Sequence, residues 1–308
     1  MEFDIKGNFQ PNKIESLELK ILRNIDSDKF LKDRITPDEL IVHLFESSSP
    51  KSLGLAAFVA IDKGKVTKHL WINNSYISSL SEDTVLYKMK HELYHIPGSV
   101  RLLKDMPYIS KSLDKWRKII TDEEFFAISG AFHAMICDVG VEQGIFLNDP
   151  HLANTCYDEE SMVLTSDMAA ILKDEKDYMF HFGKGLGGLS YTAYLLAGKK
   201  GNLEEVKKIG EKLKEEMEEV YNFSHPLVLK KLSEIANTIV DNDPFADDYS
   251  PSISGKINYI TILEDTLNAF CEIKKSLNQT FSSGMPIIRF VYTNVFEIGF
   301  LKGLNYRA

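Results

Sequence analysis

The sequence predicts an α+β fold, with a β-hairpin or small sheet and an amphipathic helix in the N-terminal half and a mainly helical C-terminal half. Three observations predict it. Residues 54–62 and 66–77 are two strand-like runs separated by the turn-forming stretch 62–65, which is typical of a β-hairpin. Residues 79–95 place apolar side chains at helical spacing. Beyond about residue 155, the character of the chain is mainly helical.

Two short elements are expected before the hairpin. Residues 13–24 alternate apolar and charged positions at a roughly helical period, which predicts a helix. Residues 37–46 are interpreted as a second short helix that begins near Pro37. Residues 48–53 are interpreted as a loop that leads into the hairpin.

The helix after the hairpin has clear expected boundaries. Ser79 or Ser81 should cap its N-terminus, with Glu82 and Asp83 in the first turn, where the helix dipole favours acidic side chains. The Pro-Gly pair at 97–98 should end it. Its apolar stripe, which should face the core, comprises Val85, Leu86, Met89 and Leu93.

The remainder of the chain contains more helix candidates. A helix over residues 125–146 is expected to stop at the Asn-Asp-Pro sequence of residues 148–150. We expect two domains, at residues 1–155 and 156–308, the second being mainly helical. Three helices are expected in the second domain, over residues 203–221, 226–240 and 256–280.

Composition favours a globular protein of the reducing cytoplasm. Of 308 residues, 44% are hydrophobic and 26% charged, and the formal net charge is −9. A negative surface repels phosphate backbones, so nucleic acid is not an expected partner. Neither a secretory signal nor a membrane-spanning run is recognisable, and three cysteines do not make a disulfide framework. The composition leaves the oligomeric state open.

The sequence His-Glu-Leu-Tyr-His at residues 91–95 carries the strongest chemical signal. Two histidines four residues apart lie on one helix face, so both imidazoles can bind one ion at about 2.0–2.1 Å. Glu92 lies about 100° around the helix from His91, where it can reach a water beside the ion. Zinc would lower the pKa of that water to about 7 and polarise a carbonyl. We therefore expect Zn²⁺ as the cofactor, His91 and His95 as metal ligands, and Glu92 as the general base.

A catalytic zinc site needs a third protein ligand and one open position. On the predicted helix 125–146, Ala134, Asp138 and Glu142 share one face at a spacing of four residues. Asp138 has apolar neighbours and should be partly buried, where a carboxylate needs a partner or a metal. Asp138 is the expected third ligand and Glu142 the alternative; the other acid could orient a ligating histidine. His133 is interpreted as an ordinary core or surface histidine.

Residues 54–98 and 125–146 resemble the zincin-type metallopeptidase domain of bacterial and phage proteins that often carry a von Willebrand factor A-like domain downstream. The resemblance covers roughly the N-terminal half of the chain. It implies a zincin-like fold for that half, zinc at His91 and His95, Glu92 as the general base and Asp138 as the third ligand. The stretches that carry the resemblance are His69–Asn74, Leu80–Asp83, Lys90–His95 and Ala134–Glu142.

The chain departs from this family pattern at three points. Val100 stands where a further histidine is common, Glu142 stands where asparagine is frequent, and no Asp-x-Ser-x-Ser motif follows residue 155. The expected function is a zinc metallopeptidase acting on a peptide or protein; the alternative is a catalytically inactive metallopeptidase-like scaffold or interaction protein. In a zincin-like fold, strand 66–77 should lie at the sheet edge beside the cleft, where an extended peptide could pair with it.

Overall fold

The computed structural model describes residues 1–49, 54–62 and 64–113, with scattered positions between 116 and 152 and between 264 and 271. The chain divides into two compact units. The first comprises Met1–Met106 and Gly144–Cys156, and the second comprises Pro107–Gln143 and Tyr157–Ala308. The domain boundary predicted after residue 155 stays a prediction, and the helices predicted beyond residue 156 lie largely outside the described residues.

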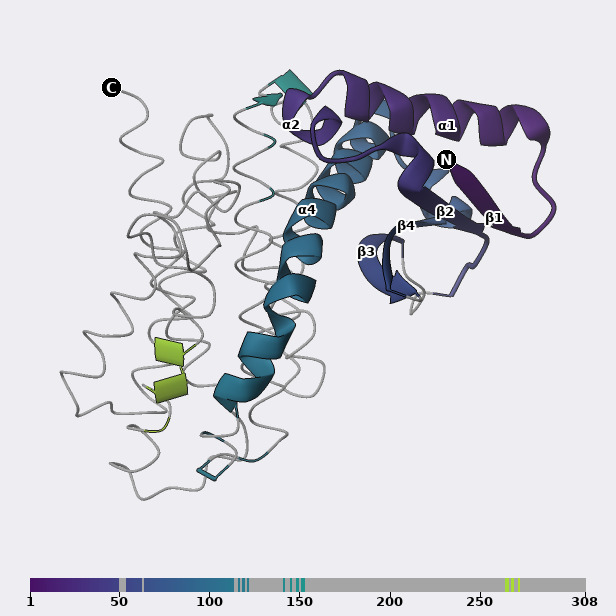
Figure 1. Cartoon of the computed structure of the whole chain (residues 1–308). Helices are drawn as coiled ribbons and strands as arrows, with labels where there is room; N and C mark the ends of the chain where they lie inside the picture. Colours follow the sequence, from purple (N-terminus) through teal and green to yellow (C-terminus); the bar gives the residue numbers. More distant parts are fainter. Residues whose placement is uncertain are drawn as a thin grey trace, which may run out of the picture. The chain divides into compact units, whose positions relative to one another are not determined.

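The first unit contains a four-stranded mixed sheet, so the predicted α+β class is confirmed for this part of the chain (Figure 1). Strands β1, β2 and β4 are parallel, whereas β3 runs antiparallel to β4. The strand order is β1-β2-β4-β3, which puts β1 and β3 at the edges. The strands are β1 (Glu2–Lys6), β2 (Leu40–Phe45), β3 (Leu55–Asp62) and β4 (Lys65–Asn73).

The predicted hairpin is confirmed, but its second strand ends earlier than predicted and lies inside the sheet, not at its edge. β3 and β4 pair from Leu55 opposite Ile72 to Asp62 opposite Lys65. β4 ends at Asn73, and residues 74–77 form the short helix α3 (Asn74–Ile77). The prediction that strand 66–77 forms the sheet edge is wrong, because β2 pairs with the other side of β4. The edge strand of the hairpin is β3.

The prediction of a helix over residues 37–46 is also wrong. Only Pro37–Glu39 form a 3-10 turn, and residues 40–45 form β2. Leu40, Val42 and Leu44 are fully buried, whereas the residues between them are partly exposed. This period of two is the pattern of a strand with one face in the core. β2 lies between β1 and β4, so its conformation depends on partners that are distant in the sequence.

Helices supply the other half of this core. The helix predicted over residues 13–24 is confirmed as α1 (Pro11–Asp26), which is followed by the short α2 (Lys29–Lys32) and, after the hairpin, by α4 (Glu82–Leu113). Asn24 of α1 donates its side-chain amide to the carbonyl of Leu86 in α4 at 3.2 Å, so these helices are neighbours. Each buried apolar side chain contributes about 1.5–3 kcal/mol to folding. The helical core residues are Leu17, Ile21, Ile25, Val85, Leu86, Met89, Leu93 and Ile96.

The start of α4 agrees with the prediction, and its end does not. The hydroxyl of Ser81 accepts the backbone N–H of Thr84 at 3.2 Å, so Ser81 is the cap. Glu82 and Asp83 occupy the first turn as expected. The expected stop at residues 97–98 is wrong, since α4 continues to Leu113. Pro97 removes one backbone donor from the helix, and its local stop signal does not end α4. No helix among the described residues is long and apolar enough to cross a membrane.

The second unit is described at only a few positions. Trp116 is 2% exposed, and its indole N–H donates to the side-chain oxygen of Asn268 at 3.1 Å. Leu267 and Cys271, which are close to Asn268 in the sequence, are also buried. These residues form part of a hydrophobic core within that unit.

Candidate metal centre

The two histidines of the motif converge as their spacing predicts. His91 and His95 lie one turn apart on α4, and both are partly buried. Their Nε2 atoms are 3.1 Å apart, and the rings meet edge to face with centroids 4.9 Å apart. We call His91 and His95 the helix pair. The two Nε2 atoms therefore face each other on one side of α4.

The geometry of the helix pair fits a shared metal ion. Two nitrogens bound tetrahedrally to zinc at about 2.0–2.1 Å are separated by about 3.3–3.4 Å. The observed 3.1 Å between the Nε2 atoms is close to this separation. The same distance also suits a hydrogen bond between one protonated and one bare imidazole nitrogen. The spacing of the pair is therefore compatible with a shared metal ion and with a direct hydrogen bond.

Glu92 is oriented by the edge strand of the sheet. Its Oε2 accepts the backbone N–H of Ala57 in β3 at 2.9 Å. Ala57 lies opposite Leu70 of β4, so its position is fixed by the hairpin register. A carboxylate held by a backbone donor keeps a defined direction. The structure thus places the carboxylate of Glu92 at the sheet edge, on the same helix as both predicted metal ligands.

The third ligand cannot be placed in the same way. Asp138, Glu142 and His133 lie outside the described residues. Within the part of the chain that the structure describes, no group of three or more histidine, cysteine, aspartate or glutamate side chains could hold a metal ion. The assignment of Asp138, with Glu142 as the alternative, stays a prediction. Val100, five residues after His95, is on α4 and supplies no metal-binding atom.

The asparagines before the motif helix organise the loop beyond the sheet. Asn73 caps α3 by accepting the N–H of Ser75, and its side chain also accepts from the N–H and donates to the carbonyl of Ser47. Asn74 donates to the carboxylate of Glu46 at 2.9 Å. These contacts fasten the segment after β2 to the end of β4. Asn73 and Asn74 are structural residues here and take no direct part in the candidate centre.

A second histidine pair lies on the opposite face of the sheet from the helical core. His43 of β2 and His69 of β4, called the sheet pair, have Nε2 and Nδ1 atoms 2.8 Å apart. Nδ1 of His43 contacts Asp4 at 2.8 Å, and Nε2 of His69 contacts the hydroxyl of Thr67 at 2.9 Å. Burial, and then the charge of His43, lower the pKa of His69. Every ring nitrogen of the sheet pair has a protein partner, so this pair does not resemble a metal site.

The sequence did not reveal the buried polar contacts made by the two residues that precede the motif histidines. Lys90 and Tyr94 immediately precede the two histidines, and both are buried. They bind Asp28 and Asp149, which come from two distant segments of the same unit. The available signal was a lysine and a tyrosine four residues apart on a helix whose neighbouring stripe is apolar. Their partners could not be named without the fold.

Comparisons with protein-family models, with curated proteins and with solved structures gave no match to this chain.

Proposed function

We propose that the protein is a zinc-dependent metallopeptidase in which His91 and His95 bind the metal, Asp138 completes the ligand set and Glu92 is the general base. The observation that supports this most directly is the convergence of the two Nε2 atoms to 3.1 Å. The contact between Glu92 and Ala57 adds a carboxylate of fixed direction beside them. A bound zinc ion would polarise the scissile carbonyl and lower the pKa of a water molecule to about 7.

The residues of the chain have separate tasks in this proposal. Glu92 takes the proton of the attacking water and passes it to the nitrogen of the leaving group. Ala57 donates to Oε2 of Glu92 and thereby holds the carboxylate beside the substrate carbonyl. The histidines stay neutral when they bind the metal, because each needs a bare nitrogen for this.

An extended peptide is the substrate that suits the edge strand. β3 forms one edge of the described sheet, and edge strands present backbone groups that can pair with another chain. Ala57 belongs to this strand and contacts Glu92, so a peptide lying along β3 would pass beside the base. A peptide selected in this way is recognised largely through its backbone.

The test measures metal content and hydrolysis together. Protein purified without added metal is assayed for bound zinc, and for cleavage of a mixed pool of quenched fluorescent peptides. Glu92→Gln should keep zinc and lose about 10²–10⁴-fold in hydrolysis, because the proton acceptor is lost. His91→Ala should lose both. Glu46→Gln is the matched control, because Glu46 binds Asn74 and has no task in the proposed mechanism, and it should keep both.

The ligand set is tested by the two predicted acids. Asp138→Asn should weaken zinc binding, whereas Glu142→Gln should leave it unchanged; the reverse result would reassign the third ligand. Wild-type hydrolysis that persists in Glu92→Gln would refute the assigned mechanism. Zinc binding by the wild type without hydrolysis of any peptide would favour the alternative of an inactive metal-binding scaffold.

A further inference from the structure

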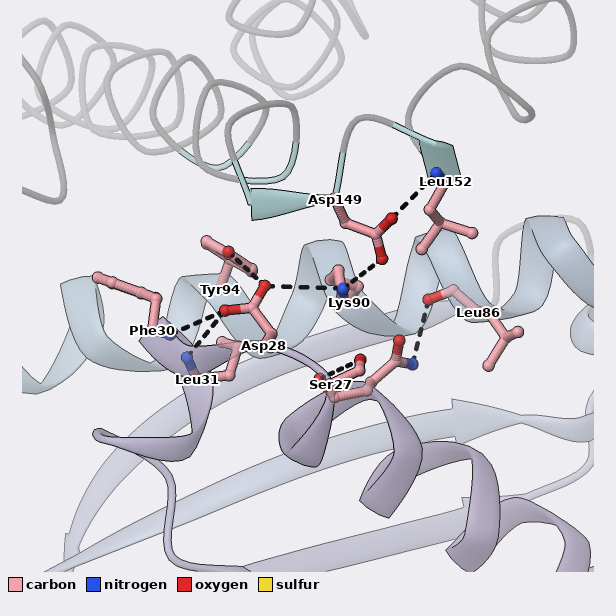
Figure 2. Close-up of polar contacts among 10 residues, drawn as sticks. Ser27, Asp28, Phe30, Leu31, Leu86, Lys90, Tyr94, Asp149 and Leu152 are labelled. Carbon is pink, nitrogen blue, oxygen red and sulfur yellow. Dashed lines mark hydrogen bonds and ion pairs between the residues drawn. The ribbon is translucent and has the colours of Figure 1, made fainter.

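A buried polar network joins Lys90 and Tyr94 of α4 to Asp28 and Asp149, as Figure 2 shows. Lys90 and Tyr94 each precede one motif histidine, and both are only 1% exposed. The hydroxyl of Tyr94 donates to Oδ2 of Asp28 at 2.6 Å. The ammonium of Lys90 lies 3.6 Å from the same oxygen and donates to Oδ2 of Asp149 at 2.7 Å. Two residues of α4 are therefore tied to fixed acids by directional contacts.

Asp28 is itself held rigidly. It caps α2, where its Oδ1 accepts the backbone N–H groups of Phe30 at 2.9 Å and Leu31 at 3.2 Å. The ring of Phe30 stacks on that of Tyr94 with centroids 5.1 Å apart. Oδ1 of Asp28 is thus bound to backbone N–H groups, whereas Oδ2 contacts the side chains of Lys90 and Tyr94 from α4, as Figure 2 shows. Asp28 can serve as a fixed reference point for the helix.

The other acid is fixed as well. Oδ1 of Asp149 accepts the backbone N–H of Leu152 at 3.1 Å, and Oδ2 binds Lys90. Burial opposes ionisation of Asp149, but the hydrogen bonds from Lys90 and Leu152 outweigh it and hold the pKa of Asp149 below its usual range. Burial and the bond to Asp28 raise the pKa of Tyr94, so its hydroxyl remains a donor. Asp149 is thus held from both sides, by Lys90 and by the backbone of Leu152.

These contacts specify the rotation of α4 more sharply than its apolar stripe does. Leu86, Lys90 and Tyr94 are spaced four residues apart on one helix face, and Asn24 also donates to the carbonyl of Leu86. Apolar contacts tolerate small rotations, whereas hydrogen bonds weaken steeply when their angle changes. Side-chain tips lie about 5–6 Å from a helix axis, so a rotation of about 20° moves them by about 2 Å. Such a shift exceeds what a zinc–nitrogen bond tolerates.

We propose that Lys90 and Tyr94 are positioning residues of the candidate metal centre. By binding Asp28 and Asp149 they fix the rotation of α4, which sets the direction in which the helix pair faces and brings Glu92 to the N–H of Ala57. The role in metal binding rests on the proposed function. The role in fixing the helix rotation does not, because the contact between Glu92 and Ala57 involves protein groups alone.

Three variants of the full chain separate positioning from general stability. Lys90→Met keeps the length of the side chain and removes its charge, and Tyr94→Phe removes one hydroxyl. Lys68→Met is the matched control, because Lys68 is also buried, at 8% exposed, and binds Glu39 at 2.7 Å and the carbonyl of Arg34 at 3.1 Å. Thermal unfolding of the metal-free proteins establishes the conditions in which all are folded. Tyr94→Phe removes the fewest atoms and serves if Lys90→Met does not fold.

The first measurement is hydrogen exchange of the Ala57 amide in the metal-free protein, taken relative to Leu70, its neighbour across the strands. The Ala57 N–H donates to Glu92, so its exchange reports whether α4 holds its rotation. We expect exchange to accelerate about tenfold or more in Lys90→Met and Tyr94→Phe, and to stay within about twofold in Lys68→Met. Unchanged Ala57 exchange in both network variants, or equal acceleration in Lys68→Met, would overturn the proposal.

The second measurement is zinc affinity, determined by competition with a chelator. We expect Lys90→Met and Tyr94→Phe to bind zinc about 10–100-fold more weakly than the wild type, as is usual when groups that orient ligands are removed. Lys68→Met should bind as the wild type does. Faster Ala57 exchange with unchanged zinc affinity would refute the role in metal binding. A wild type that binds no zinc would refute the proposed function but not the positioning role. Exchange of the Ala57 amide would still show whether the network fixes the rotation of α4.

Discussion

Among the described residues, two histidine pairs bring their ring nitrogens within 3.1 Å or less of each other, yet their surroundings differ. In the helix pair, Nε2 faces Nε2 beside a carboxylate that a backbone donor holds in place. In the sheet pair, Nε2 of His43 faces Nδ1 of His69, and the outer nitrogens bind Asp4 and Thr67. A short distance between imidazoles is therefore not enough to identify a metal centre. The atoms that each ring nitrogen contacts must also be known.

The largest expected effect sharpens this contrast in metal binding. His91→Ala should reduce zinc affinity by more than about 100-fold, because a ligand contributes more than the groups that orient it. His43→Ala should leave zinc affinity within about twofold, although it removes the same kind of ring. Isothermal titration of both variants with zinc measures the difference. A comparable loss in His43→Ala would mean that the sheet pair takes part in the metal site.

The next largest effect concerns the support of the helix pair. Asp28→Ala removes a helix cap and leaves Tyr94 and Lys90 without their common acceptor. Breaking a buried charged contact from one side destabilises a protein by about 3–5 kcal/mol. Urea unfolding of the metal-free protein should show a loss of this size. A loss below about 1 kcal/mol would indicate that the network contributes little to folding.

A smaller effect is expected at the sheet pair. Thr67→Val preserves the branched shape of the side chain but removes the hydroxyl that contacts Nε2 of His69 and donates to the carbonyl of Ala60. Loss of such a hydrogen bond should lower the free energy of unfolding by about 1 kcal/mol. Zinc affinity should stay unchanged, which distinguishes this variant from any in the helix pair. Weaker zinc binding in Thr67→Val would contradict the separation of the two pairs.

The smallest expected effect is a dependence on pH that originates in the sheet pair. Because burial, followed by the charge of His43, lowers the pKa of His69, the folded protein takes up this proton less readily than the unfolded chain does. The stabilising contribution of neutral His69 is present above about pH 6.5 and declines as the pH falls below that value. Urea unfolding of metal-free protein between pH 7.5 and pH 5.5 measures it. His69→Phe should show a shallower decline, and an equal decline in both proteins would exclude this origin.

The sequence predicted those parts of the fold that depend on neighbouring residues. The hairpin, the cap at Ser81 and the apolar stripe of α4 all follow from local spacing, and the structure confirms them. β2 was mistaken for a helix because Pro37 and the acids after it suggest a helix start. Its strand conformation comes from pairing with β1 and β4 on either side. Because β2 pairs with β4, the edge strand of the hairpin is β3 and not the predicted second strand.

The candidate site divides in the same way. The convergence of His91 and His95 follows from one helical turn, so a motif search could find it. The contact of Glu92 with Ala57 needed the position of the edge strand, and that of Lys90 with Asp149 joins segments far apart in the chain. Pro97 showed that a local stop signal can be overridden, since α4 continues past it. Longer-range contacts of this kind were beyond single-sequence reasoning.

The strand order has a consequence for the way the unit is assembled during synthesis. β1 leaves the ribosome before the other three strands of the described sheet, yet Glu2 pairs with Ile41, and Ile41 in turn pairs with His69 of β4. The hairpin closes a much shorter loop, and short loops close at a lower entropic cost. We expect the hairpin to form first, β2 to dock onto it, and β1 to join last. The sheet is therefore complete only when β1, which is synthesised before the other described strands, pairs with a β2 already docked on the hairpin.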